Sequence, residues 1–154
     1  MMDVRIRRAR QGDAARLHEL HTKSVREICA RHYGPDVIDG WLANRGPDGY
    51  LVPIARGDLF VAADCETHVV GFGEATPGVI VACYVDPAFV GRGVGSAIMT
   101  HALERAGSGH HGSIRVEATL NAVAFYARFA FREIKRGTLR RGAVDVPYVL
   151  MERP

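Results

Sequence analysis

The chain has 154 residues, of which 47% are hydrophobic and 24% charged, and its formal net charge is only +3. A length of this order suits one domain with one core, so we expect a single domain over residues 1–154. The mild, dispersed charge does not favour nucleic-acid binding. No run of about 18 apolar residues is present, so no membrane span is expected.

The N-terminal stretch "MMDVRIRRARQGD" has no apolar core of the kind that a signal peptide needs, and we therefore expect a cytoplasmic protein. The three cysteines are odd in number and widely spaced, which favours reduced thiols over a disulfide framework or a metal pair. His18 and His21 lie three residues apart in "HELH", but no third ligand accompanies them. We expect them on an amphipathic helix, and no metal is expected.

The first half of the chain gives signals for strands and helices. "VRIRRA" alternates polar and apolar residues, as a half-buried strand does. Asp13 can cap a helix that Gly34-Pro35 stops, and Asp36 can cap a second, short helix. The loop "NRGPDG" then precedes two strands joined by a short link. The strands expected in this half are residues 4–9, 58–64 and 68–75.

The second half begins with a nearly continuous apolar run, Val79 to Val85, which is typical of a central strand covered on both faces. Three glycines in five positions follow it and precede a helix that runs to about Ala106. The remaining expected elements are a strand at 113–118, a short helix at 121–130, and strands at 131–137 and 146–153 on either side of a basic loop.

The expected order is therefore β-α-α-β-β-β-α-β-α-β-β. Hairpin-length links imply antiparallel pairs, whereas the strand-helix-strand unit from Val79 to Ala118 implies one parallel pair. The predicted class is α/β (α+β), with a single mixed, mostly antiparallel sheet of about seven strands and helices on both faces.

The three glycines, Gly91, Gly93 and Gly95, need a reason, because each costs about 0.5–1 kcal/mol relative to alanine in regular structure. The first turn of a helix leaves backbone N–H groups without partners, which favours anion binding there. Glycines would let a phosphate approach these amides, and Arg92 adds positive charge. A simple tight turn also explains the glycines. A dinucleotide fingerprint in "GRGVGS" is disfavoured, because only one strand-helix-strand unit surrounds it.

Two segments together resemble the GCN5-related N-acetyltransferase (GNAT) family. "VDPAFVGRGVGS" is similar to the family pattern "V-x-P-x-x-R/Q-G-x-G-x-G/A", and "NAVAFYARFAF" to the later pattern "N-x-x-A-x-x-F-Y-x-x-x-G-F". The opening "IRRARQGDAARLHEL" also resembles the family's first strand and helix. Val90 stands where the family has Arg or Gln, and Ala130 replaces a glycine that ends a helix. A non-glycine residue there predicts an altered helix end or strain.

The resemblance implies an N-acetyltransferase that takes acetyl-CoA as cosubstrate and acts on a primary amine. The pyrophosphate would bind the backbone amides of residues 91–96, and the pantetheine arm would lie along the preceding strand, opposite Asn121. The implied cofactor-binding residues are Cys83, Tyr84, Val85, Val90, Gly91, Arg92, Gly93, Val94, Gly95, Ser96, Asn121 and Tyr126.

The resemblance also implies direct attack of the amine, without a covalent enzyme intermediate. Tyr126 matches the family's tyrosine that protonates the CoA sulfur, and phenol and thiol have close reference pKa values of roughly 10 and 8.5. Glu74 or Glu117 could act as the general base, directly or through water, although taken singly each is better explained as a solvated or salt-bridged carboxylate. The alternative is a non-catalytic acyl-CoA sensor, which would not need Tyr126.

In this fold the acceptor amine would bind between the first two helices and the last hairpin. The residues expected there are Tyr33, Asp36, Asp39, Trp41 and the segment near Arg140. The family resemblance also allows a homodimer.

Overall fold

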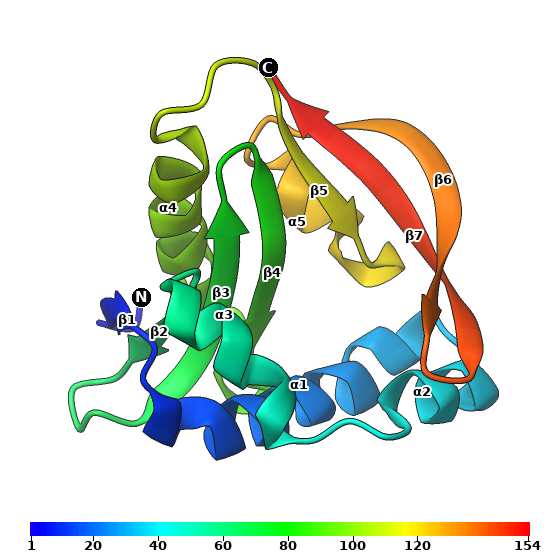
Figure 1. The fold of residues 1–154 in the computed structure, drawn as a ribbon, viewed down its shortest axis with the longest axis horizontal. Helices are drawn as coiled ribbons and strands as arrows, with labels where there is room; N and C mark the ends of the chain where they lie inside the picture. The colour runs from blue at the N-terminus through cyan, green and yellow to red at the C-terminus, as the bar shows by residue number, and fades with distance from the viewer.

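The computed structural model describes residues 1–154 and contains one seven-stranded sheet in the order β1-β2-β3-β4-β5-β7-β6 (Figure 1). Only β4 and β5 pair in parallel, so the mixed, mostly antiparallel sheet confirms the predicted fold class. The strands are β1 Arg5–Arg8, β2 Leu59–Ala63, β3 Val69–Thr76, β4 Val79–Val85, β5 Ile114–Ala118, β6 Arg132–Arg141 and β7 Val144–Arg153. The helices are α1 Ala14–Glu27, α2 Pro35–Leu42, α3 Leu51–Arg56, α4 Val94–Gly107 and α5 Val123–Ala127.

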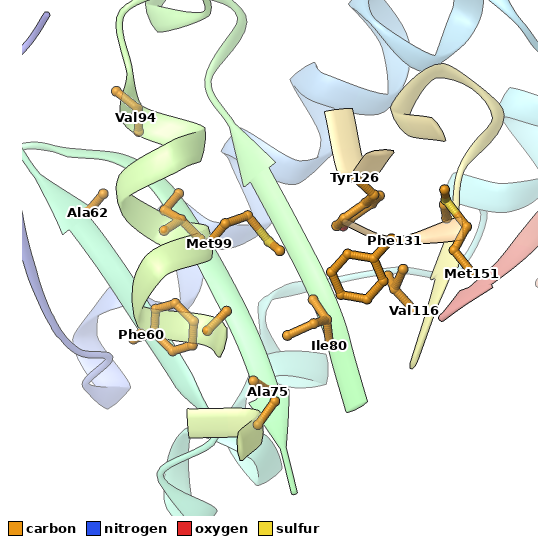
Figure 2. Packing of buried hydrophobic residues seen from close by; sticks show 14 of the residues in the cluster. Phe60, Ala62, Ala75, Ile80, Val94, Met99, Val116, Tyr126, Phe131 and Met151 are labelled. Atoms are coloured by element: carbon orange, nitrogen blue, oxygen red, sulfur yellow. The ribbon is translucent and has the colours of Figure 1, made fainter. Parts of the chain in front are cut away.

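Alternation along the strands separates two hydrophobic layers, because successive side chains point to opposite faces of a sheet. On β2, Phe60 and Ala62 join the core that α4 and α5 cover, while Leu59 and Val61 join the core beneath α1 and α3. Figure 2 shows the first of these cores, with Met99 of α4 and Tyr126 of α5 on either side of β4. The sheet is thus covered on both faces, as predicted.

Helix α4 packs closely on the sheet because β3 carries glycines beneath it. A Cβ atom at Gly73 would lie 2.6 Å from the Phe60 ring and 2.7 Å from Ile98 of α4, so a side chain there would push the helix away. This close contact fixes the N-terminal end of α4 beside the end of β4.

The central strand β4 differs from its prediction. It lies in the middle of the sheet, but it is not covered along its length: only Ile80 is fully buried, and Val81 is 48% exposed. The reason is that β5 pairs with β4 only at Val79 and Ile80 and then diverges from it. The apolar run predicted the strand correctly but could not reveal that its second half borders an opening.

Two other segments, both in the first half of the chain, differ from prediction. The first helix ends at Glu27, well before Gly34-Pro35, and an additional helix, α3, follows the predicted loop. Helix α3 carries Pro53 in its first turn, where proline is tolerated, and Gly57 ends it with a left-handed φ of 77°.

None of the helices combines the length and the apolar character that a membrane-spanning segment requires.

The basic stretch that was expected to be a loop lies in β6 instead. Strand β6 pairs with β7 from Arg132 to Arg141, and only Gly142 and Ala143 form the turn. Its charged residues suit an edge strand, where positive side chains discourage pairing with another chain. The turn rests on α2, because the Ala143 N–H donates to the Gly40 carbonyl at 3.4 Å. Figure 1 shows the hairpin reaching down to this helix.

Candidate active site

The divergence of β4 from β5 opens a cavity of about 210 Å³, which we call the β4 cavity. Its lining residues from β4 face residues that follow β5 in the chain. The Asp86 N–H bonds the Val70 carbonyl of β3, and backbone N–H groups alternate in direction along a strand. The N–H groups of Val85 and Cys83 therefore point toward the opening. The predicted site residues that line the β4 cavity are Cys83, Tyr84, Val85, Val90, Gly95, Glu117, Asn121 and Tyr126.

The turn from β4 to α4, residues 85–96, contains the three glycines, and we call it the glycine corner. Its backbone conformation favours glycine at two positions. Gly91 and Gly93 have φ values of 77° and 86°, in the left-handed region, and Gly93 is the N-cap of α4. The first helical hydrogen bond runs from the Ala97 N–H to the Gly93 carbonyl, so the N–H groups of residues 94–96 have no acceptor within the chain. These amides and the dipole of a 14-residue helix make this end of α4 attractive to anions.

A second hollow of about 380 Å³, the corner hollow, lies against the glycine corner and continues into the β4 cavity. The residues that line both are Val85, Val90, Gly95 and Phe125. Gly91, Gly93 and Ser96 also line the corner hollow, whereas the Val94 side chain is buried in the core. The Arg92 side chain is exposed and lies over the Phe89 ring at 5.5 Å. An exposed arginine that the sequence did not single out, Arg128, lines the corner hollow as well.

Asp86 holds the corner to α1. Its buried carboxylate accepts hydrogen bonds from the Ala88 N–H at 2.9 Å and from Arg16 Nη2 at 2.7 Å, and Lys23 Nζ lies 3.6 Å away. Burial works to raise the pKa of Asp86, but these hydrogen bonds and positive charges outweigh it and lower the pKa below its usual value. A charged Asp86 therefore fixes the turn between β4 and the glycines.

Two side chains on the far side of the β4 cavity have unusual environments. Burial, with smaller contributions from Cys83 and Tyr84, raises the pKa of Tyr126 well above its usual value, so its phenol is protonated at neutral pH. The Oδ1 atom of Asn121 is buried and has no hydrogen-bond partner in the chain. An unpaired buried acceptor costs about 1–3 kcal/mol, which a donor on a bound molecule would recover.

Cys83 cannot readily act as a nucleophile. Burial raises the pKa of its thiol to about 12, so almost none of the reactive thiolate exists at neutral pH. This environment agrees with a reaction that does not pass through an enzyme thioester.

A third opening of about 220 Å³, the side cavity, lies next to the β4 cavity. The two share Val81, Ala82, Tyr84, Glu117 and Thr119. Glu74 lines the side cavity only, and its pKa is raised by burial and by the charge of Asp58. Glu117 is exposed and stands where the two cavities meet, and neither glutamate forms an ion pair within the chain.

The acceptor residues expected from the sequence are mostly elsewhere. Trp41 lines the side cavity, but the Tyr33 hydroxyl is used within the chain: it donates to the Pro147 carbonyl at 2.6 Å and accepts from the Leu120 N–H at 2.9 Å. Asp39 is exposed and pairs with Arg26. Asp36 is exposed and does not line the cavity, whereas the segment near Arg140 contributes Leu139 and Arg141 to its wall.

Sequence reasoning missed His21, Arg45 and Tyr50, which do line the side cavity. No local motif marks them, because they come from α1 and from the segment before α3. Nowhere does the structure gather three His, Cys, Asp or Glu side chains as a metal ion would need.

Comparisons with known proteins agree with this geometry. Residues 29–152 match the model of the acetyltransferase (GNAT) domain family. The chain is 25% identical over 155 residues to the "Uncharacterized N-acetyltransferase YafP" of Escherichia coli, covering 100% of this chain and 99% of that protein. It is also 32% identical over 107 residues to the "Uncharacterized N-acetyltransferase MJ1207" of Methanocaldococcus jannaschii, covering 65% of this chain and 47% of that protein.

Solved structures share the fold. A GCN5-related N-acetyltransferase from Rhodopseudomonas palustris, also described as a class-II aminotransferase, superposes with a TM-score of 0.91 at 23% identity, over 99% of this chain and 97% of that one. The PaiA N-acetyltransferase from Thermoplasma acidophilum, solved with coenzyme A, gives a TM-score of 0.78 at 19% identity, over 99% of both chains. The chain therefore belongs to the GNAT family, as its two motifs predicted. It is an acetyl-CoA-dependent acetyltransferase.

Proposed function

We propose that the protein transfers the acetyl group of acetyl-CoA to a primary amine, with the donor bound along the β4 cavity and the corner hollow. The observation that carries this proposal is the set of unpaired N–H groups at residues 94–96, directly beside the opening between β4 and β5. Family membership favours an enzyme over the acyl-CoA sensor.

The residues present fit such a donor. The pyrophosphate would accept hydrogen bonds from the amides of the glycine corner, with Arg92 and Arg128 supplying nearby positive charge. The pantetheine arm would pair with the free edge of β4 at Cys83 and Val85. The unpaired Oδ1 of Asn121 would accept one of the arm's N–H groups. Val90, 51% exposed, supplies an apolar contact where the family has a polar side chain.

The proposed chemistry uses two groups that line the β4 cavity, the Val85 N–H and the Tyr126 phenol. The neutral amine attacks the thioester carbonyl carbon, and the N–H of Val85, which points into the opening, stabilises the oxyanion that forms. Collapse of this tetrahedral species breaks the C–S bond. The protonated Tyr126 phenol gives its proton to the leaving thiolate and regains one from solvent.

Glu117 is the better candidate for the base. It stands at the junction of the two cavities, where the amine must lose a proton as its nitrogen bonds to carbon. Glu74 lines the side cavity only, so it would act through water, although burial raises its pKa and would make its carboxylate a stronger base. The single domain and the homodimer stay predictions, which proteolysis and sedimentation would test.

A thiol-release assay with acetyl-CoA and a panel of amines tests the proposal. Tyr126→Phe should lower kcat about tenfold or more with little change in the Kd of acetyl-CoA, because the phenyl ring keeps the packing and only the proton donor is lost. Glu117→Gln should lower kcat about a hundredfold.

Glu104→Gln, at an exposed glutamate on the outer side of α4, is the matched control and should leave kcat unchanged. Unchanged turnover in Tyr126→Phe would remove this residue from the mechanism. Failure of the parent protein to bind acetyl-CoA would overturn the proposed function as a whole.

A further inference from the structure

Arg45 is the charged residue of the side cavity whose environment is hardest to explain by folding alone. It is half-buried, and no carboxylate oxygen lies within 4.0 Å of its guanidinium. Its Nη2 atom donates to His21 Nδ1 at 2.8 Å and lies 3.1 Å from the Tyr50 hydroxyl. The Nε and Nη1 atoms make no hydrogen bond within the chain.

The groups that hold Arg45 carry no negative charge. A guanidinium can only donate, so His21 Nδ1 must accept, which places the histidine's proton on Nε2. Burial and then the charge of Arg45 lower the pKa of His21 well below its usual value, so the ring is neutral. Tyr50 is also neutral, because burial raises its pKa. Hydrogen bonds to His21 and Tyr50 therefore hold the guanidinium of Arg45 in place, but no negative charge within the chain neutralises it.

A second arginine, Arg141, lines the same cavity from the β6–β7 hairpin. It too forms no ion pair within the chain, and the two glutamates of the cavity lie more than 4.0 Å from either arginine. The cavity thus carries two cations and two carboxylates that form no ion pairs with one another. Of these four groups Arg45 and Glu74 are half-buried, and buried charges are costly unless a partner neutralises them.

We propose that the acceptor is a small amine that carries its own anionic group, a carboxylate or a phosphonate. Resting on the proposed function, this inference assigns the anion to Arg45 and Arg141 and the amine to the side of Glu117, next to the β4 cavity. A volume of about 220 Å³ is below the range of about 300–1,000 Å³ typical of sites for drug-sized ligands. The two arginines also favour a single amino acid over an aminoglycoside or a polyamine, whose ionised groups are all positive.

The test compares matched acceptors with acetyl-CoA in the thiol-release assay. The panel contains the common amino acids, the α-amide of each, and 2-aminoethylphosphonate, so that carboxylate, neutral and phosphonate acceptors are separated. We expect kcat/KM for the best anionic acceptor to exceed that of its neutral counterpart about ten- to a hundredfold, the range for hydrogen bonds to a charged group. The difference should lie mainly in KM.

Arg45→Gln should abolish this preference by lowering kcat/KM for the anionic acceptor to about that for its neutral counterpart. Arg141→Gln should reduce the preference as well, and this exposed side chain keeps the test usable where Arg45→Gln fails to fold. Arg31→Gln, at an exposed arginine outside the cavity, is the matched control.

Two measurements separate this inference from the proposed function. Failure of the parent protein to bind acetyl-CoA, measured by calorimetry, would overturn both proposals. Intact acetyl-CoA binding with equal or better turnover of the neutral acceptors, or with no turnover of any anionic one, would overturn this inference alone.

Discussion

The glycine corner and the side cavity are built in opposite ways. The corner is a continuous segment, residues 85–96, and its binding groups are mainly backbone N–H groups. The side cavity is lined by side chains from α1, the loop before α3, three strands of the sheet and the β6–β7 hairpin. A donor that many enzymes share can be bound by a backbone conformation that a short motif specifies. An acceptor that differs between enzymes requires side chains, which can vary without disturbing that motif.

The largest effect we expect is on the anchor of the corner. Asp86→Asn should lower the free energy of unfolding by about 3 kcal/mol at pH 7, because it leaves the positive charge of Arg16 without its buried partner. Asp39→Asn, which breaks an exposed pair with Arg26, should cost about 0.5 kcal/mol or less. Chemical denaturation measures both, and equal losses would contradict the special role of Asp86.

The loss of stability in Asp86→Asn should depend on pH. The pKa of Asp86 is lowered in the folded state, so its contribution to stability is present above the unfolded pKa of about 3.9 and is lost as pH falls through the folded value. The stability difference between the parent and Asp86→Asn should therefore shrink only below about pH 4. A difference that shrinks near pH 6 instead would point to another titrating group.

A smaller effect, on the Kd of acetyl-CoA, should distinguish the glycine corner from the side cavity. Gly95→Val would place a Cβ about 3.0 Å from the Phe125 ring, within the passage between the corner hollow and the β4 cavity. We expect the Kd of acetyl-CoA to rise about ten- to a hundredfold, matching an overpacking cost of about 1–3 kcal/mol. Gly107→Ala, at the open end of the same helix, should leave this Kd unchanged. A change in acceptor KM with no change in donor Kd would contradict the assignment of the corner to the donor.

The smallest effect concerns the helix end beside Tyr126. Ala130 has a φ of 67°, in the left-handed region, as its place in the family pattern predicted. Ala130→Gly should raise the free energy of unfolding by about 1 kcal/mol, because glycine adopts this conformation without steric strain. Thermal denaturation measures the gain. A loss of stability would show that the methyl group of Ala130 packs favourably enough to outweigh the strain.

The sequence alone determined the mixed sheet, the order of the elements apart from helix α3, the glycine corner and the family. These features depend on interactions between residues close in the chain: the alternation of apolar residues in strands, the lack of Cβ atoms at Gly91 and Gly93, and the unpaired amides of a helix's first turn. The roles of the individual site residues stay predictions.

Only the tertiary structure decided where β4 is open and what lines the side cavity. The exposure of Val81 depends on β5 diverging from β4 after two paired residues. The contact of Arg45 with His21 joins residues 24 positions apart, and Arg141 reaches them only because the hairpin turn rests on α2. Contacts between residues so far apart in the chain depend on how the helices pack on the sheet and how far the hairpin extends. Neither can be predicted from a local sequence pattern.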